Sequence, residues 1–223
     1  MSRRMWIPLG AVILVVNAVQ WVVAEAVTAA AWTSPPYSYA RNYISDLGVP
    51  DCGTRFQGRD ICSPDHALMN TSFMLEGILF AAGVLLLARL VEGRARRVVI
   101  ALAVAHGVGM VMVGLFHGSE SGPSLGLALH VGGAGVGILC ANTLAILAGS
   151  LRSLALPQAY RVFSVTVGVL GLVSVALVGV SASVAGVFER GSVYSWMLWS
   201  VVTGALLLAR YVSRPAVVEN VSA

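Results

Sequence analysis

The sequence predicts an all-α fold, a polytopic membrane helix bundle with six transmembrane helices. Apolar residues make up 57% of the 223 residues and charged residues only 11%, whereas a soluble domain carries roughly 25% charge. A globule of this size could not hide so much apolar surface, so lipid must cover part of it. Six apolar runs lie near the roughly 20 residues that cross a bilayer. We therefore interpret 1–223 as a single integral membrane domain, which excludes a cytosolic enzyme.

The first run, 6–32, begins and ends with tryptophans, which favour the two membrane interfaces. It is too long for the apolar core of a signal peptide and contains Asn17 and Gln20, so we expect an uncleaved span. Short connections separate most of the remaining runs, and none is long enough to divide the chain into two domains. We expect these runs at about 67–91, 98–116, 124–149, 160–186 and 192–212.

The basic residues indicate how the bundle is oriented. All 14 are arginines, and the absence of lysine excludes Schiff-base and P-loop enzymes. They lie beside apolar segments rather than in a basic stripe, so we expect no nucleic-acid partner. Most fall on one side, which predicts a cell-membrane protein with both termini cytoplasmic and the connection 33–65 extracytoplasmic. The arginines on the other side are Arg41, Arg55, Arg59 and Arg190.

The connection 33–65 contains two cysteines, Cys52 and Cys62, at a spacing that permits a disulfide. Oxidation is favourable outside the cytoplasm, and such a bond would stabilise the loop by about 2–3 kcal/mol. We also expect a short helix in the membrane interface ahead of the cysteines. Its apolar residues recur at near-helical spacing, namely Tyr37, Ala40, Ile44 and Leu47.

Two short stretches resemble a known family. Ile44-Ser45-Asp46-Leu47-Gly48 follows the first span, and the second span carries Asn70 and Gly77. Together with six spans and an arginine-rich second connection, they are similar to the domain of unknown function 998 (DUF998) family of prokaryotic membrane proteins over roughly 6–212. The resemblance implies a six-span fold and no particular activity. The Ile-Ser-Asp stretch is more weakly similar to eukaryotic six-span proteins of the Frag1/DRAM type.

Ionisable side chains inside a membrane are energetically costly, so each is a candidate functional group. The spans contain Glu25, Glu76, His106 and His130. A helical rise of about 1.5 Å per residue places Glu25 and His130 in one layer, and Glu76 with His106 in a deeper one. The upper pair could act as a proton relay, because histidine titrates near neutral pH. Two further ligand-binding candidates lie outside this set, Asp46 and Asn70.

Three functions fit these residues. The first is binding or movement of a lipid or small amphiphile in an outward-facing polar cavity. The second is a non-catalytic envelope scaffold that assembles with a membrane-protein partner or with another copy, its buried pairs only holding helices together. The third is a metal-dependent lipid hydrolase. Its candidate metal ligands, which lack any tight motif, are His66, His117 and His130. We expect no cofactor, and membrane lipid is a partner in every case.

Overall fold

A computed structural model describes residues 5–50, 52, 54–56, 59–118 and 124–213. Within these residues six helices are long and apolar enough to cross a membrane. They are α1 (Trp6–Ala31), α2 (His66–Leu87), α3 (Gly93–Leu115), α4 (Leu125–Ser150), α5 (Gln158–Leu177) and α6 (Ala185–Val212). The predicted all-α, six-span membrane bundle is confirmed.

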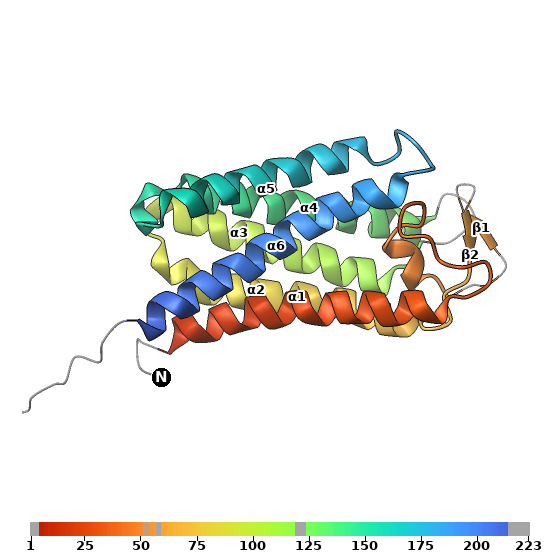
Figure 1. The fold of residues 1–223 in the computed structure, drawn as a ribbon, viewed down its shortest axis with the longest axis horizontal. Coiled ribbons are helices and arrows are strands. Elements are labelled where there is room, and N and C mark those ends of the chain that lie inside the picture. Colours follow the sequence, from red (N-terminus) through yellow and green to blue (C-terminus); the bar gives the residue numbers. More distant parts are fainter. Residues whose placement is uncertain (1–4, 51, 53, 57–58, 119–123, 214–223) are drawn as a thin grey trace, which may run out of the picture.

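The six helices form a closed ring. Each packs on its neighbour in the sequence, and α6 returns to pack on α1. Figure 1 shows that the start of α1 and the end of α6 lie together, beside the connections 88–92 and 151–157. We call this side of the bundle the arginine-rich end. The opposite side, the loop end, carries the connection 178–184 and the described parts of the connections 32–65 and 116–124.

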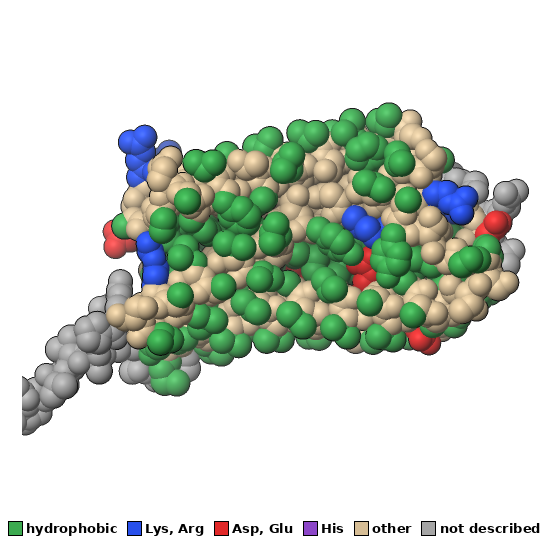
Figure 2. All heavy atoms as spheres, in the orientation of Figure 1, with side chains coloured by type: hydrophobic (Ala, Val, Ile, Leu, Met, Phe, Trp, Pro, Cys, Tyr) green, Lys and Arg blue, Asp and Glu red, His purple; other side chains and the backbone are tan. Residues whose placement is uncertain are grey.

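The two ends of the bundle carry most of the charged side chains, and the middle is mainly apolar. The face shown in Figure 2 has a broad band of hydrophobic side chains, with charged side chains mostly at either end. Val16, Val19 and Val23 of α1 are exposed, as expected for side chains that contact lipid. The described cations of the arginine-rich end are Arg89, Arg94, Arg96, Arg97, Arg152, Arg161 and Arg210, and the described anion is Glu92.

Glycines let neighbouring helices approach very closely. A Cβ atom on Gly77 of α2 would lie 2.6 Å from the carbonyl oxygen of Gly107 on α3. A Cβ atom on Gly133 of α4 would lie 2.6 Å from the carbonyl oxygen of Gly109, also on α3. Lipid provides no hydrophobic force between helices, so backbone contact of this kind holds α2, α3 and α4 together.

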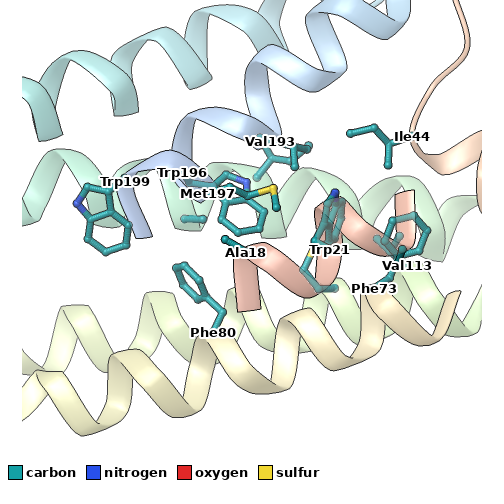
Figure 3. Packing of buried hydrophobic residues seen from close by; sticks show 14 of the residues in the cluster. Ala18, Trp21, Ile44, Phe73, Phe80, Val113, Val193, Trp196, Met197 and Trp199 are labelled. Atoms are coloured by element: carbon teal, nitrogen blue, oxygen red, sulfur yellow. The ribbon is translucent and has the colours of Figure 1, made fainter. Parts of the chain in front are cut away.

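Large aromatic side chains fill the middle of the ring (Figure 3). The ring of Trp21 lies 5.0 Å from that of Phe73 and 6.2 Å from that of Trp196, centroid to centroid. Phe80 lies 5.6 Å from Trp196 and 6.3 Å from Trp199. We call these five residues the aromatic layer. It separates the interior of the loop end from that of the arginine-rich end.

The connection 32–65 differs from the sequence expectation. In place of an interfacial helix through Tyr37 to Leu47, it forms turns and a single 3₁₀ turn, η1 (Ser45–Gly48). The carbonyl oxygens of Tyr39 and Asn42, which a helix would use for its own hydrogen bonds, instead accept hydrogen bonds from Arg190 of α6. An antiparallel hairpin follows, made of β1 (Thr54–Phe56) and β2 (Arg59–Ile61). The predicted disulfide between Cys52 and Cys62 is present.

The last two spans also have different boundaries from those expected. Helix α5 ends at Leu177 rather than at 186, and Gly179, with a φ of 92°, turns the chain soon afterwards. Helix α6 begins at Ala185 rather than at 192. Glu189 and Arg190 fall between the expected spans 160–186 and 192–212, where charged residues indicated a loop, but they lie inside α6. Both side chains find partners within the protein.

Candidate functional site

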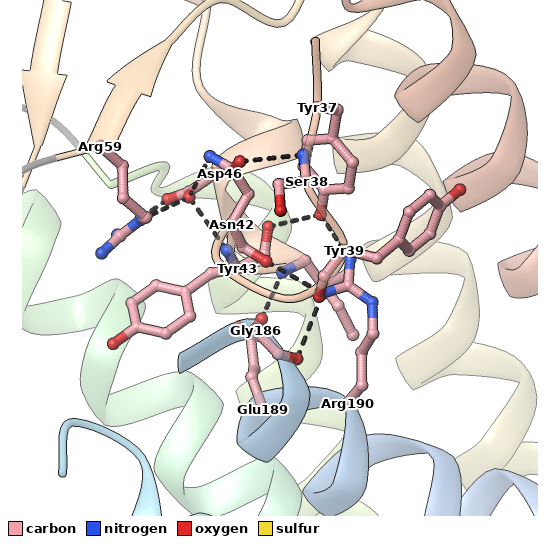
Figure 4. A network of polar contacts seen from close by, with 11 residues as sticks. Tyr37, Ser38, Tyr39, Asn42, Tyr43, Asp46, Arg59, Gly186, Glu189 and Arg190 are labelled. Atoms are coloured by element: carbon pink, nitrogen blue, oxygen red, sulfur yellow. Dashed lines mark hydrogen bonds and ion pairs between the residues drawn. The ribbon is translucent and has the colours of Figure 1, made fainter. Parts of the chain in front are cut away.

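Arg190 is the centre of a polar network at the loop end (Figure 4). The residue is only 7% exposed. Its Nε atom donates to Oε1 of Glu25 at 3.0 Å, and a terminal nitrogen donates to the carbonyl oxygens of Tyr39 at 2.7 Å and Asn42 at 2.9 Å. One guanidinium thus joins the first helix, the long connection and the last helix.

The hydroxyl of Tyr37 extends this network into the connection. It accepts a hydrogen bond from the other terminal nitrogen of Arg190 at 2.5 Å and donates to the carbonyl oxygen of Tyr43 at 2.8 Å. Burial raises the pKa of Tyr37 well above its usual value, against the lowering effect of the Arg190 charge. The hydroxyl therefore stays protonated and can keep donating to Tyr43.

Glu25 does not pair with His130, contrary to the proton relay inferred from depth. Its second carboxylate oxygen accepts a hydrogen bond from the hydroxyl of Tyr194 at 2.9 Å, and its first is held by Arg190. The imidazole Nδ1 of His130 instead lies 2.5 Å from the carbonyl oxygen of Phe116. Both side chains are buried at similar depth but are bound to different parts of the bundle.

Asp46 forms the second ion pair of the loop end. Its two carboxylate oxygens accept hydrogen bonds from Arg59 at 2.8 and 3.1 Å, and one of them also accepts from the backbone N–H of Tyr43 at 3.0 Å. Burial lowers the pKa of Arg59, but the hydrogen bond and charge of Asp46 outweigh it, and the pKa lies above its usual value. This pair fastens the hairpin to η1.

Asn70 and Glu189 hold the same short stretch against the helices. The amide of Asn70 on α2 donates to the carbonyl oxygen of Gly48 at 2.8 Å. The carboxylate of Glu189 on α6 accepts from the backbone N–H of Ile44. A Cβ atom on Gly48 would overlap Oδ1 of Asn70, so a larger residue here would displace the Asn70 side chain. The stretch from Ile44 to Gly48 is therefore the part of the connection that docks onto the bundle.

The deeper layer does form a contact. Glu76 and His106 are both 0% exposed, and the imidazole Nε2 lies 3.1 Å from each carboxylate oxygen. Asn17 of α1 donates to Oε1 of Glu76 at 3.0 Å, and Nδ1 of His106 lies 2.8 Å from the carbonyl oxygen of Gly137 on α4. This cluster, the Glu76–His106 pair, therefore links four consecutive helices.

The geometry fixes where hydrogens must lie in this pair. Since a carbonyl oxygen can only accept, Nδ1 of His106 carries a hydrogen and donates to Gly137. One further hydrogen must lie between Nε2 and the carboxylate of Glu76, because otherwise two acceptors would face each other. The rings of Phe80 and Trp196 lie 4.1 and 5.1 Å from the imidazole and exclude water. The pair is thus closed and has no net charge.

The three histidines considered as metal ligands are not brought together. His66 is bonded through Nδ1 to the carbonyl oxygen of Ser63 at 3.1 Å, and Nδ1 of His117 lies 3.5 Å from that of Gly118. No group of three His, Cys, Asp or Glu side chains in the described part of the chain could hold a metal ion. The metal hypothesis gains no support from these residues, because each imidazole lies against a backbone carbonyl oxygen, that of Ser63, Gly118 or Phe116.

A cavity of about 310 Å³ lies inside the ring at the arginine-rich end. All six helices line it, together with the connections 88–92 and 151–157. Its wall is mainly apolar, and its deepest residues include Leu14 of α1, Leu144 of α4 and Trp199 of the aromatic layer. By contrast, a cavity of about 30 Å³ lies under η1 at the loop end, where a polar cavity was expected. Ion pairs and backbone contacts occupy that space.

The polar side chains on the wall of the large cavity mostly bond to one another. Trp199 Nε1 donates to the hydroxyl of Tyr160 at 3.1 Å, and that hydroxyl lies 2.8 Å from the hydroxyl of Thr203. Arg210 is the charged side chain of the lining. Sequence reasoning missed both this cavity and Arg190. Leucines and valines in a span do not indicate whether a cavity lies beside them. An acid within a span, such as Glu25, does indicate that a basic partner lies nearby.

A family model described as Protein of unknown function (DUF998) matches residues 15–206 of the chain. The match covers Asp46, Asn70, Gly77, the Glu76–His106 pair and Arg190. No curated protein and no solved structure matches the chain. The weaker likeness to proteins of the Frag1/DRAM type has no support among these comparisons.

Proposed function

Because the chain belongs to the DUF998 family, whose description assigns no function, we propose its function from its own geometry: it binds the hydrocarbon chain of a lipid or other amphiphile. The observation that carries this proposal is the cavity of about 310 Å³ inside the ring of helices. Ligand sites are typically concave, mainly apolar, and about 300–1,000 Å³ in volume. This cavity meets each of these criteria.

The position of the cavity supports a membrane ligand. Its mouth lies at the arginine-rich end, where Arg210, Tyr211 and the connection 151–157 form the rim. A hydrocarbon chain in such a site exchanges lipid contacts for protein contacts, so affinity must come from shape and from the few polar groups at the rim. The lipid-binding hypothesis is therefore moved from the loop end to the opposite end of the bundle.

The distribution of arginines indicates which end of the bundle faces the cytoplasm. Seven described arginines gather at the arginine-rich end against one glutamate, and cytoplasmic loops carry such an excess. We place this end in the cytoplasm and the disulfide-closed connection outside, in the cell membrane. A reporter fused after Val212 should be active only if it is a cytoplasmic reporter. Activity of an exported reporter at the same position would reverse the assignment.

A brominated chain tests binding directly, because bromine quenches tryptophan fluorescence on contact and Trp199 lies in the cavity wall. The protein, in phosphatidylcholine nanodiscs, is titrated with 11-bromoundecanol. Saturable quenching of Trp199 is expected, measured as the part that disappears in Trp199→Phe. Ala148→Phe places a ring inside the cavity and should abolish it. The matched control is Ala205→Phe, which adds the same ring on the exposed side of α6.

The outcomes are distinct. Equal quenching in Ala148→Phe and Ala205→Phe would show that the probe senses the bilayer and not the cavity. Absence of saturable quenching in the unaltered protein would remove the amphiphile proposal. In that case the non-catalytic scaffold hypothesis gains support, since the ion pairs of the loop end would then be the main polar feature left to explain.

A further inference from the structure

Arg210 differs from the two buried arginines, Arg59 and Arg190, in what it binds. Arg59 and Arg190 each hold a carboxylate at 3.1 Å or less. Arg210 has no carboxylate partner among the described residues, and its two terminal nitrogens share the carbonyl oxygen of Ala155 at 3.3 and 3.4 Å. Hydrogen bonds from an ionised donor to an ionised acceptor are typically about 2.7–2.9 Å. The guanidinium therefore keeps most of its capacity to bind an anion.

The partner of Arg210 lies on an unusual piece of backbone. Ala155 has a φ of 47°, a left-handed conformation that non-glycine residues rarely adopt. It lies in the connection 151–157, which forms one side of the cavity mouth. Unfavourable backbone conformations of this kind gather at ligand sites. The carbonyl group of Ala155 thus holds the guanidinium at the rim without neutralising its charge.

The surroundings favour a negatively charged partner. Tyr160, Thr203 and Trp199 are hydrogen-bonded to one another on the same wall. The arginine-rich end has a strong excess of positive charge, because Glu92 is its described anion. Such an excess attracts anionic lipid headgroups. Apolar wall below and a half-exposed guanidinium above match the two parts of an anionic amphiphile.

We propose that Arg210 binds the anionic headgroup, a phosphate, sulfate or carboxylate, of an amphiphile whose single hydrocarbon chain lies in the cavity. This inference rests on the proposed function and adds the ligand class to it. The volume of about 310 Å³ is near the lower limit for ligand sites, so one chain is accommodated. That chain belongs either to a single-chain amphiphile or to a bilayer phospholipid whose second chain stays outside.

The test uses three probes with the same 11-bromoundecyl tail and different headgroups: the sulfate, the alcohol and the trimethylammonium. Quenching of Trp199 is titrated in phosphatidylcholine nanodiscs. The sulfate should bind about tenfold more tightly than the alcohol, and the ammonium more weakly than either. Arg210→Gln should remove the advantage of the sulfate and leave the alcohol unchanged. Arg94→Gln, an equal loss of charge at an exposed site of α3 outside the cavity, should change neither.

Each result decides between defined possibilities. If the alcohol binds but Arg210→Gln leaves the sulfate-to-alcohol ratio unchanged, the headgroup proposal is wrong while the proposed function stands. If no probe quenches Trp199, the proposed function itself fails. If Arg94→Gln lowers sulfate binding as much as Arg210→Gln, the preference comes from the general surface charge. Displacement of the sulfate by phosphatidylglycerol in the nanodisc would identify a bilayer lipid as the source, and its persistence a free amphiphile.

Discussion

The two ends of the bundle each place an arginine of α6 near the interior, with opposite results. Arg190 at the loop end is 7% exposed and is bound by Glu25, three backbone carbonyls and Tyr37. Arg210 at the arginine-rich end is half-buried, and its two terminal nitrogens both donate to the carbonyl oxygen of Ala155, at 3.3 and 3.4 Å. The comparison teaches that burial of a charge does not by itself mark a ligand site. A charge with unused bonding capacity beside a cavity is the better indicator.

The largest effect should come from Arg190→Met at the loop end. The change keeps an apolar side chain but leaves Glu25 buried without its cation. It also leaves the carbonyl oxygens of Tyr39 and Asn42 without their hydrogen-bond donor. Breaking a buried ion pair typically destabilises a protein by about 3–5 kcal/mol, and unfolding by SDS titration in mixed micelles measures this. Arg152→Met, at an exposed site, is the control. Equal stability of the two variants would contradict a structural role for the network.

A somewhat smaller effect is expected from Glu76 in the middle of the ring. Glu76→Ala leaves His106 and Asn17 without their shared partner and should lower the free energy of unfolding by about 3 kcal/mol. Glu76→Gln should change it by less than about 1 kcal/mol. A glutamine oxygen can accept from Asn17 while its amide donates to Nε2 of His106. A severe loss in both variants would mean that the pair needs the ionised carboxylate.

Removal of the disulfide should act locally on the loop end. Replacing Cys52 and Cys62 together by serine should destabilise the connection by about 2 kcal/mol, because a short loop is no longer closed in the unfolded chain. Faster hydrogen exchange is expected in the amides of 43–49, with little change in α4. Cys140→Ser, a free thiol within α4, serves as the control. Increased exchange around the cavity would show that the two ends are coupled.

The smallest effect on stability is expected at the arginine-rich end. Arg210→Gln should change the free energy of unfolding by less than about 0.5 kcal/mol, since the guanidinium has no ion pair among the described residues. The same variant should weaken binding of an anionic amphiphile about tenfold. The SDS titration used for Arg190→Met allows direct comparison. A loss of stability as large as that of Arg190→Met would erase the distinction between the two ends.

Composition and periodicity predicted the architecture because lipid imposes a simple rule on every span. Six apolar runs were located in the sequence, and the helices lie where expected except near the fifth connection. There, Glu189 and Arg190 indicated a loop, since charges favour water. The interior provides these charges with a carboxylate, hydroxyls and carbonyl groups, so the helix continues through them. Only the tertiary contacts reveal such partners.

The candidate site was less predictable for a related reason. Depth along a helix placed Glu76 beside His106 correctly in space, but it also suggested a Glu25–His130 contact. Glu25 instead binds Arg190, and His130 lies against the carbonyl oxygen of Phe116. The expected helix around Ile44 is replaced by turns, because side chains from α2 and α6 take up its backbone groups. The cavity is space between helices that the side chains of leucines and alanines leave empty. The order of apolar residues along the sequence does not reveal such a space.

The ion pair between Glu25 and Arg190 has a consequence for how the chain is made. Its two residues are 165 positions apart, in the first and last helices. During synthesis, the first helix enters the membrane long before the last one. The carboxylate of Glu25 therefore has no Arg190 to bind until the chain is nearly complete. A nascent or truncated protein lacking α6 therefore carries an unmatched acid at membrane depth. The carboxylate of the first helix is thus neutralised only after the last helix has inserted and packed against it.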